Sequence, residues 1–238
     1  MITLSPSTQK NRKRRLSTRV VERRERIIQT VRTLIAKRGI EPVGMRDLAE
    51  ECGVAVTTLY NQFGSREGVI GAALHAVFRD HFVPLAERTQ NLSPAQQIDA
   101  RITAATQAIL GELREYSRST MSFYFSPTPH PLLRSELHDF VVVDFRHVVE
   151  DIERRGDLEP WVDIPSFTDD IVTQHYSLVM KWVQGYIRDQ DLHTRCLRAI
   201  GTSFMGVTHG NTRLEIKQLI AADAGRVAIV PTREADAI

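Results

Sequence analysis

The stretch Gly44-Met-Arg-Asp-Leu-Ala-Glu-Glu-Cys-Gly-Val-Ala-Val-Thr-Thr-Leu-Tyr-Asn-Gln-Phe-Gly-Ser-Arg66 decides the fold of the N-terminal part of this chain. Its pattern predicts two short helices that meet at Gly53, because glycine can adopt the positive φ that a tight turn needs. Val54 and Leu59 are expected in the shared core, and the small Ala49 lets the second helix approach the first. Such a pair of helices is a helix-turn-helix, which places its second helix in the major groove of DNA.

Several side chains of this stretch are expected to face outward and to meet DNA. Arg46, at the start of the first helix, has the planar fork that fits O6 and N7 of guanine. Tyr60 also has a second interpretation, as a core aromatic residue whose hydroxyl reaches the surface. The outward positions of the second helix are Val56, Thr57, Thr58, Tyr60 and Asn61.

Charge is distributed unevenly along the 238 residues, although the net charge is only +2. Residues 1–67 contain 14 Lys and Arg against 7 Asp and Glu, and residues 68–238 contain 17 against 22. A basic head on an acidic body indicates a polyanionic partner at one end, which we take to be double-stranded DNA. No apolar run is long enough to span a membrane and no apolar segment follows the basic N-terminus, so we expect a cytoplasmic protein with no membrane partner.

The first 18 residues are polar and contain a basic cluster. We expect a flexible arm over residues 1–18, which is either a solvated tail or a DNA-contacting segment. The cationic residues assigned to DNA in this arm are Arg12, Lys13, Arg14 and Arg15.

Helical periodicity runs through the rest of the chain and no strand pattern accompanies it, so the predicted fold class is all-α. We expect a DNA-binding domain over residues 19–68, with its first helix from about Arg19 to Arg38, and a helical ligand-binding and dimerisation domain over 69–238. Pro84 is expected to interrupt the helix that begins after Ser65, and residues 94–116 are expected to form one long helix. A short helix over 214–222 is plausible.

The N-terminal residues resemble the tetracycline-repressor (TetR) family of bacterial transcription regulators. The resemblance runs from about Arg26 to Leu74 and rests on short motifs at fixed offsets. It implies an all-helical homodimer with a DNA-binding head and a larger body that binds a small-molecule effector. The motifs are Asp47-Leu48-Ala49, Cys52-Gly53-Val54, Thr58-Leu59-Tyr60, Phe63 and Ser65-Arg66-Glu67.

The resemblance also implies roles for individual residues. Arg46 matches a position that can reach a base edge, and Arg66 matches a position usually held by a phosphate-binding lysine. Thr58 and Tyr60 match hydroxyl groups that contact phosphates. The positions that match the recognition helix are Val56, Thr57 and Asn61.

The chain departs from the family pattern at three positions. Gly44 and Ala55 stand where the two helices often have a side-chain cap, and Thr57 replaces the glycine common before Thr58. These departures bear on the operator sequence that the chain would read and leave the prediction of DNA binding unchanged.

The body is expected to dimerise and to hold an effector. The helices around 171–187 and 192–205 are the dimerisation candidates, where Gly185, Gly201 and Gly206 either permit close approach of two protomers or are merely small residues within one. A further set of side chains either lines a pocket for a hydrophobic or aromatic molecule or packs in the core. This set is Phe123, Tyr124, His138, His147, His175, Tyr176, Met180 and Trp182.

Motifs of catalysis and cofactor binding are missing from the sequence, which has no HExxH, glycine-rich phosphate loop or nucleophile elbow. Asp144, His147 and Asp151 share one helix face that either is solvated or binds a metal, and we expect neither a metal nor a cofactor. Cys52 and Cys196 are expected to be buried thiols.

The expected function is therefore that of a ligand-responsive transcriptional repressor. It would bind a pseudo-palindromic operator as a homodimer and leave it when a small, hydrophobic or aromatic molecule binds. Two alternatives stay open from the sequence: a transcriptional activator, and a DNA-positioned interaction module of the kind that inhibits cell division over the nucleoid. Enzymatic activity is not expected.

Overall fold

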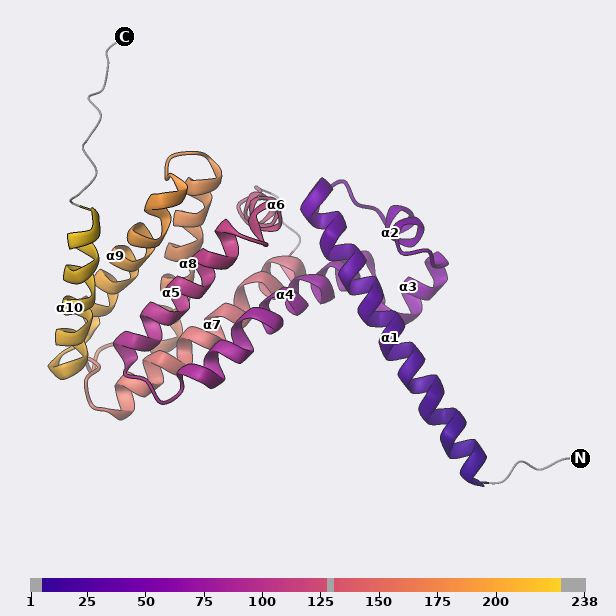
Figure 1. The fold of residues 1–238 in the computed structure, drawn as a ribbon, viewed down its shortest axis with the longest axis horizontal. Helices are drawn as coiled ribbons and strands as arrows, with labels where there is room; N and C mark the ends of the chain where they lie inside the picture. Colours follow the sequence, from indigo (N-terminus) through magenta and orange to yellow (C-terminus); the bar gives the residue numbers. More distant parts are fainter. Residues whose placement is uncertain (1–5, 128–130, 228–238) are drawn as a thin grey trace, which may run out of the picture. The chain divides into compact units, whose positions relative to one another are not determined.

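The computed structural model describes residues 6–127 and 131–227, and the regular elements of these residues are all helices (Figure 1). The predicted all-α class is confirmed. None of the described helices is long and apolar enough to cross a membrane. The helices are α1 (Pro6–Arg38), α2 (Met45–Glu51), α3 (Val56–Phe63), α4 (Arg66–Thr89), α5 (Pro94–Leu110), α6 (Arg114–Tyr124), α7 (Pro131–Arg154), α8 (Ile164–Val183), α9 (Asp189–Val207) and α10 (Gly210–Val227).

Packing divides the chain into two compact units. The first unit comprises residues 1–77 and 115–137, and the second comprises residues 78–114 and 138–238. This division differs from the predicted boundary at residue 68, because α6 and the start of α7 pack with the N-terminal helices. The single helix α4 belongs to both units, since the division falls inside it.

The first unit is built on the apolar stripe of α1. Ile27, Val31, Leu34 and Ile35 recur at intervals of three or four residues, and each is at most 5% exposed. Helical spacing of this kind puts the four side chains on one face, where they form a core with buried residues of α2, α3 and α4. The partners on those helices include Leu48, Ala49, Leu59, Val69, Ile70 and Leu74.

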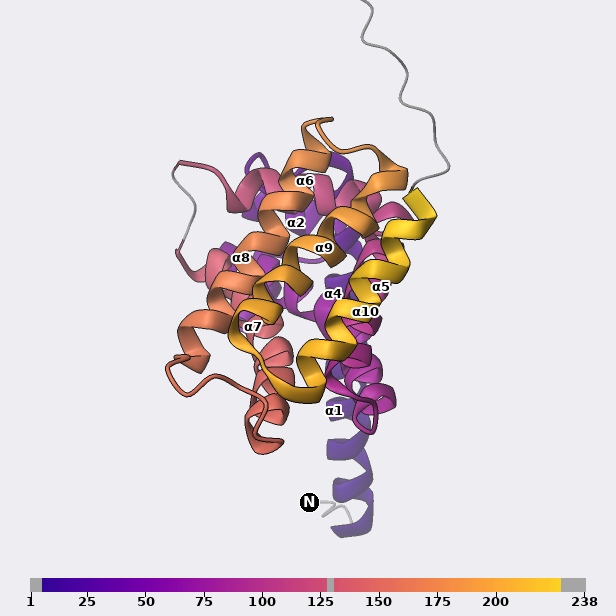
Figure 2. The same cartoon turned by 90° about the vertical axis from the view of Figure 1, so that its left-hand side faces the viewer.

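In the second unit α9 packs against α8, α5 and α10, and Figure 2 shows α10 running beside α9. A Cβ atom on Gly201 would lie 2.8 Å from Cδ1 of Ile220, so the missing side chain lets α10 approach α9 within one chain. Gly185 has a φ of 82° at the end of α8, which explains a glycine there without a second protomer. Gly185 and Gly201 are thus explained by packing and backbone conformation within one protomer.

Three predicted helix boundaries in the body are wrong. α4 continues through Pro84 to Thr89, because burial of Leu85 and Thr89 beyond the proline stabilises the helix there. The helix expected over 94–116 is split at Gly111, where the backbone turns with φ −101° and ψ −119°. α10 is longer than the expected 214–222 segment and begins at Gly210.

Candidate nucleic-acid interface

The turn between α2 and α3 has the geometry that its sequence predicted. Gly53 has a φ of 62°, a conformation that a residue with a side chain adopts only under strain. At the start of α2, the Gly44 N–H donates to Oδ2 of Asp47 at 2.9 Å, so the first turn is capped although Gly44 has no side chain. Ala55 precedes α3 without a side-chain cap, and its C=O accepts from the Thr58 N–H at 2.8 Å. The two helices are thus held at a fixed, short turn.

α3 has one buried face and one exposed face. Leu59 is fully buried, whereas Thr57, Tyr60 and Asn61 are exposed and Val56 and Thr58 are half-buried. Tyr60 is 51% exposed, which selects the surface interpretation of this residue over the core one. Val54 is only half-buried, so its expected place in the core is corrected to the rim of the turn.

Arg46 lies exposed in the first turn of α2. Within the part of the chain that the structure describes, no hydrogen bond or ion pair engages its guanidinium group. An exposed, unengaged arginine on α2, the helix that packs against α3, can make the bidentate contact to guanine that its side chain permits. The predicted base-reading role of Arg46 therefore remains compatible with its position.

Arg66 has a different surrounding from the one that a phosphate contact requires. Its Nε donates to the Val43 carbonyl at 2.5 Å, and its Nη2 donates to the carbonyls of Ile40 and Glu41 at 2.6 Å and 3.2 Å. Nη1 lies 3.3 Å from Oε1 of Glu67. Nε and Nη2 thus bind the connection between α1 and α2, and Nη1 faces Glu67 of α4, so Arg66 holds this connection against the start of α4. Its contact with a phosphate stays a prediction.

The basic cluster of the expected flexible arm lies within a helix. α1 begins at Pro6, and the predicted start at about Arg19 is wrong. Proline at the first position, the many Lys and Arg residues after it, and the absence of any further proline or glycine until Gly39 explain why the helix extends this far. The helix includes Arg12, Lys13, Arg14 and Arg15.

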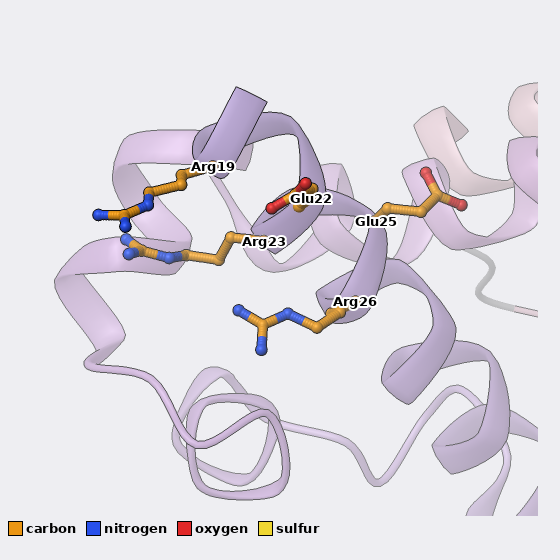
Figure 3. A pocket seen from close by; sticks show the side chains of 5 residues that line it. All are labelled: Arg19, Glu22, Arg23, Glu25 and Arg26. Atoms are coloured by element: carbon orange, nitrogen blue, oxygen red, sulfur yellow. The ribbon is translucent and has the colours of Figure 1, made fainter. Parts of the chain in front are cut away.

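Sequence reasoning missed three exposed arginines on α1: Arg19, Arg23 and Arg26. They line a hollow of about 660 Å³ together with Glu22 and Glu25, and Figure 3 shows the three guanidinium groups extending to the same side of the helix. Their spacing of four and three residues was a signal that could have found them, because such positions share one helix face.

A second hollow of about 500 Å³ joins α1 to the helix-turn-helix. Arg23, Arg26 and Thr30 line it from α1, and Thr58 lines it from α3. Residues 52–54 of the turn complete its wall. The hydroxyl that the sequence assigned to a phosphate therefore shares a hollow with two arginines.

The thiol of Cys52 also borders this second hollow. Burial raises its pKa to about 11, with a smaller contribution from the neighbouring Glu51 carboxylate. The sulfur is therefore a neutral thiol at physiological pH. Burial likewise raises the pKa of Cys196 to about 12.

The predicted effector-binding residues fall in both units. Phe123 and Tyr124 are buried in the first unit. The other six belong to the second unit, where His175, Tyr176 and Trp182 are buried and Met180 is half-buried. His147 is exposed, with a side chain that is 65% accessible and lies 3.5 Å from Glu150, so it is removed from the set of pocket-lining candidates.

Two of the second-unit candidates, His138 and His175, lie around a third, Tyr176. The ring centroid of His138 lies 6.0 Å from that of Tyr176, and Nε2 of His138 lies 2.7 Å from Oδ1 of Asp169. The ring of His175 lies 6.2 Å from the same tyrosine. Both ring nitrogens of His175 are buried without a hydrogen-bond partner, and burial lowers its pKa to about 4. A neutral imidazole in this place can accept or donate one further hydrogen bond.

Trp182 is engaged at the end of α8. Its Nε1 donates to Oδ1 of Asp189 at 2.8 Å, and the guanidinium carbon of Arg114 lies 5.5 Å from the centre of its ring. These contacts account for the burial of the indole without a ligand.

The helix face that carries Asp144, His147 and Asp151 is used for ion pairs within the chain. Arg101 Nε and Nη2 donate to the two carboxylate oxygens of Asp144 at 2.9 Å and 3.0 Å, and both side chains are buried. Burial raises the pKa of Asp144, and the charge of Arg101 acts in the opposite direction. Asp151 pairs with Arg155 at 3.0 Å. Among the described residues, no group of three His, Cys, Asp or Glu side chains is placed to hold a metal ion.

Comparison with known proteins finds a family match for the N-terminal helices. Residues 27–73 match the model for bacterial regulatory proteins of the tetR family. The HTH-type transcriptional repressor KstR2 of Rhodococcus jostii is 27% identical over 153 residues, which cover 63% of this chain and 70% of that repressor.

Solved structures show the same fold. RolR in complex with resorcinol has a TM-score of 0.62 at 17% identity, with coverage of 86% of this chain and 96% of RolR. FadR of Bacillus subtilis in complex with stearoyl-CoA has a TM-score of 0.61 at 16% identity, with coverage of 75% and 96%. The family match covers α2, α3 and parts of α1 and α4. Residues 27–73 of this chain are therefore similar to the tetR family of bacterial regulatory proteins.

Proposed function

We propose that this chain is a homodimeric transcriptional repressor that leaves its operator when a small molecule binds its body. The observation that carries the DNA-binding part is the exposed face of α3 with Thr57, Tyr60 and Asn61, and the exposed Arg46 on the neighbouring α2 adds an unengaged guanidinium group. Repression itself is supported by the similarity to the repressor KstR2. A regulator of this kind acts on chromosomal DNA and therefore works in the cytoplasm.

The dimer follows from how a helix-turn-helix reads DNA. Two copies related by a two-fold axis would insert their α3 helices into successive major grooves, about 34–36 Å apart, and would thus read a pseudo-palindromic operator. We assign the subunit contact to α8 and α9, the two helices that the sequence analysis names as dimerisation candidates.

The effector is proposed to be a molecule with a hydrophobic or aromatic part and at least one hydrogen-bonding group. Two proteins with a similar fold, RolR and FadR, bind resorcinol and stearoyl-CoA, which share this character. His175 supports the polar requirement, because burial of both its ring nitrogens without a partner costs free energy that a ligand atom would recover. His138, Tyr176 and Met180 of the second unit stay candidates for the apolar lining.

Release from DNA needs only a difference in effector affinity between two conformations of the dimer. A coupling free energy of about 1–3 kcal/mol changes the affinity for DNA about 5- to 150-fold. α4 is the proposed carrier of this coupling, since it is one continuous helix that belongs to both packing units.

The test is capture and sequencing of the genomic fragments that the purified protein binds. One or a few promoter sites with an inverted repeat would support a repressor, and reporter expression from those promoters in a deletion strain should rise. A fall in expression would instead show an activator. Many dispersed sites away from promoters would replace the proposal with the interaction module, and the absence of any enriched fragment would refute both.

A further inference from the structure

α1 carries a line of arginines that leads to the recognition helix. Positions 12, 15, 19, 23 and 26 are three or four residues apart, so the backbone of this 33-residue helix puts them on one face. All five are arginine. With a rise of about 1.5 Å per residue, they are separated by about 4.5–6 Å along the helix axis, so they form a row of cations.

The three described members of this line are available for an outside partner. Arg19, Arg23 and Arg26 are exposed, and none has a hydrogen bond or ion pair with another described residue. Arg24, on another face of the same helix, behaves differently. Its Nη1 donates to the Gln62 carbonyl at 2.8 Å, and its guanidinium carbon lies 4.2 Å from the centre of the Phe63 ring. The chain thus uses one arginine of this segment to hold α3 and leaves three unengaged.

The end of the line opens into the hollow that α1 shares with α3. Arg23 and Arg26 border it beside the half-buried Thr58, so two cationic groups and one hydroxyl converge on the same space. Charge-assisted hydrogen bonds from arginine are the strongest contacts that a side chain makes to a phosphate, and a hydroxyl adds a neutral donor. The hollow therefore has the chemistry of a phosphate site.

We infer that Arg19, Arg23 and Arg26 of α1, with Thr58 of α3, bind consecutive phosphates of one DNA strand beside the groove that α3 enters. This inference rests on the proposed DNA-binding function and extends it to a surface outside the helix-turn-helix. Contacts of this kind carry no sequence information, so they set the affinity and register of the head on any duplex.

Two carboxylates on the same segment limit the contact and supply a test of opposite sign. Glu22 and Glu25 border the arginine hollow, and Figure 3 shows Glu25 turned away from the three guanidinium groups. Glu25 also accepts a hydrogen bond from Nε2 of Gln29 at 3.5 Å. Glu22 is therefore the carboxylate that would repel a phosphate in this hollow, so Glu22→Gln should strengthen binding to every duplex.

The experiment measures fluorescence anisotropy of a labelled duplex of arbitrary sequence with the full chain between 50 and 200 mM salt. The wild type is compared with Arg23→Ala/Arg26→Ala. Each lost phosphate contact lowers the slope of log K against log salt by about 0.9, so the variant should lose about 1.8 per bound head. The ratio of the wild-type association constant to that of the variant should therefore fall about 12-fold when the salt is raised from 50 to 200 mM.

The matched control is Arg213→Ala/Lys217→Ala, which removes the same charge from exposed positions of α10. It should keep the wild-type slope. Both variants should keep the wild-type unfolding midpoint, because all four side chains are exposed.

An unchanged slope in the α1 variant, or an equal loss in the α10 control, would overturn the inference while leaving DNA binding by α3 intact. Binding of the wild type to no duplex at all would instead refute the proposed function. Should the α1 variant lose affinity only for anionic lipid vesicles and not for DNA, a membrane surface would replace the phosphate strand as the partner and the inference would be wrong.

Discussion

Removal of the Arg66 guanidinium separates two accounts of this residue. The family resemblance assigns it to a phosphate, whereas the structure directs it at the connection between α1 and α2 through the carbonyls of Ile40, Glu41 and Val43. In the structural account Arg66→Ala loosens residues 40–43 and the start of α4. In the phosphate account it removes a charge from the DNA surface and leaves the fold unchanged.

The magnitude follows from the bonds that are lost. Each hydrogen bond from a charged donor contributes about 1.5–3 kcal/mol when buried, and less here because the side chain of Arg66 is 24% exposed. Three such bonds at roughly 1 kcal/mol each give a loss of about 2–4 kcal/mol in the free energy of unfolding of the first unit. Arg66→Lys should recover only part of this loss, because an ammonium group cannot reproduce the fork that spans three carbonyls.

Hydrogen exchange of the amides in residues 40–66 is the suitable assay, since both tryptophans lie in the second unit and do not report on the first. We expect faster exchange in Arg66→Ala and an intermediate rate in Arg66→Lys, with the slope of DNA affinity against salt unchanged in both. Wild-type exchange in Arg66→Ala, together with a slope reduced by about 0.9, would refute the structural account and restore the phosphate contact.

Four further predictions test other parts of the molecule. Arg46→Ala should reduce discrimination between the operator and a scrambled duplex by about 1–3 kcal/mol, and equal discrimination would contradict its base-reading role. Asp144→Ala should destabilise the second unit by about 3–5 kcal/mol, because it leaves the charge of Arg101 buried and unpaired, whereas the apolar pair Arg101→Met/Asp144→Leu should be nearly neutral in urea unfolding. His175 has a folded pKa of about 4 against 6.5 in the unfolded chain, so the unfolded state binds the extra proton and stability falls as the pH drops from about 6.5 to 4. His175→Phe should remove that part of the acid loss, on the order of 3 kcal/mol, and an unchanged pH profile would show that the imidazole is solvated. Deletion of residues 1–18 should lower the salt slope of DNA binding, and an unchanged slope would make this part of α1 a passive extension.

Local signals in the sequence were sufficient for the helix-turn-helix. Gly53 indicated the turn and Leu59 indicated the buried face of α3, and both signals depend only on residues that are close in the sequence. The exposure of Thr57, Tyr60 and Asn61 followed from the same 3.6-residue period. The fold class was predictable for the same reason, because helical periodicity is repeated along the chain.

The errors arose where tertiary packing overrides a local rule. Pro84 removes a backbone donor and yet lies inside α4, since burial of Leu85 and Thr89 compensates the lost bond. Gly111 ends α5 where apolar spacing alone predicted continuation, and a glycine in such a pattern deserved more weight as a helix end. The burial that continues α4 beyond Pro84 cannot be seen in the sequence, whereas Gly111 is a signal that the sequence itself contains.

The roles of individual side chains depended on partners distant in sequence. Arg66 lies 23 to 26 residues from the carbonyls that it contacts, and Asp144 lies 43 residues from Arg101. No spacing rule within one helix could reveal either pair. The α1 arginines are the opposite case, since the spacing of Arg19, Arg23 and Arg26 was visible and only their exposure and their place beside Thr58 needed the structure.

Hydroxyl-radical footprinting of the protein on a duplex selected from the genome tests the central claim most directly. We predict two protected half-sites on one face of the DNA, centred about 34–36 Å apart and related by an inverted repeat, with protected sugars extending outward where α1 follows the strand. The Arg46→Ala variant should lose the protection of the half-sites before it loses non-specific binding. Protection that is uniform along the duplex, or a single unrepeated half-site, would contradict a dimer that reads its operator through α3.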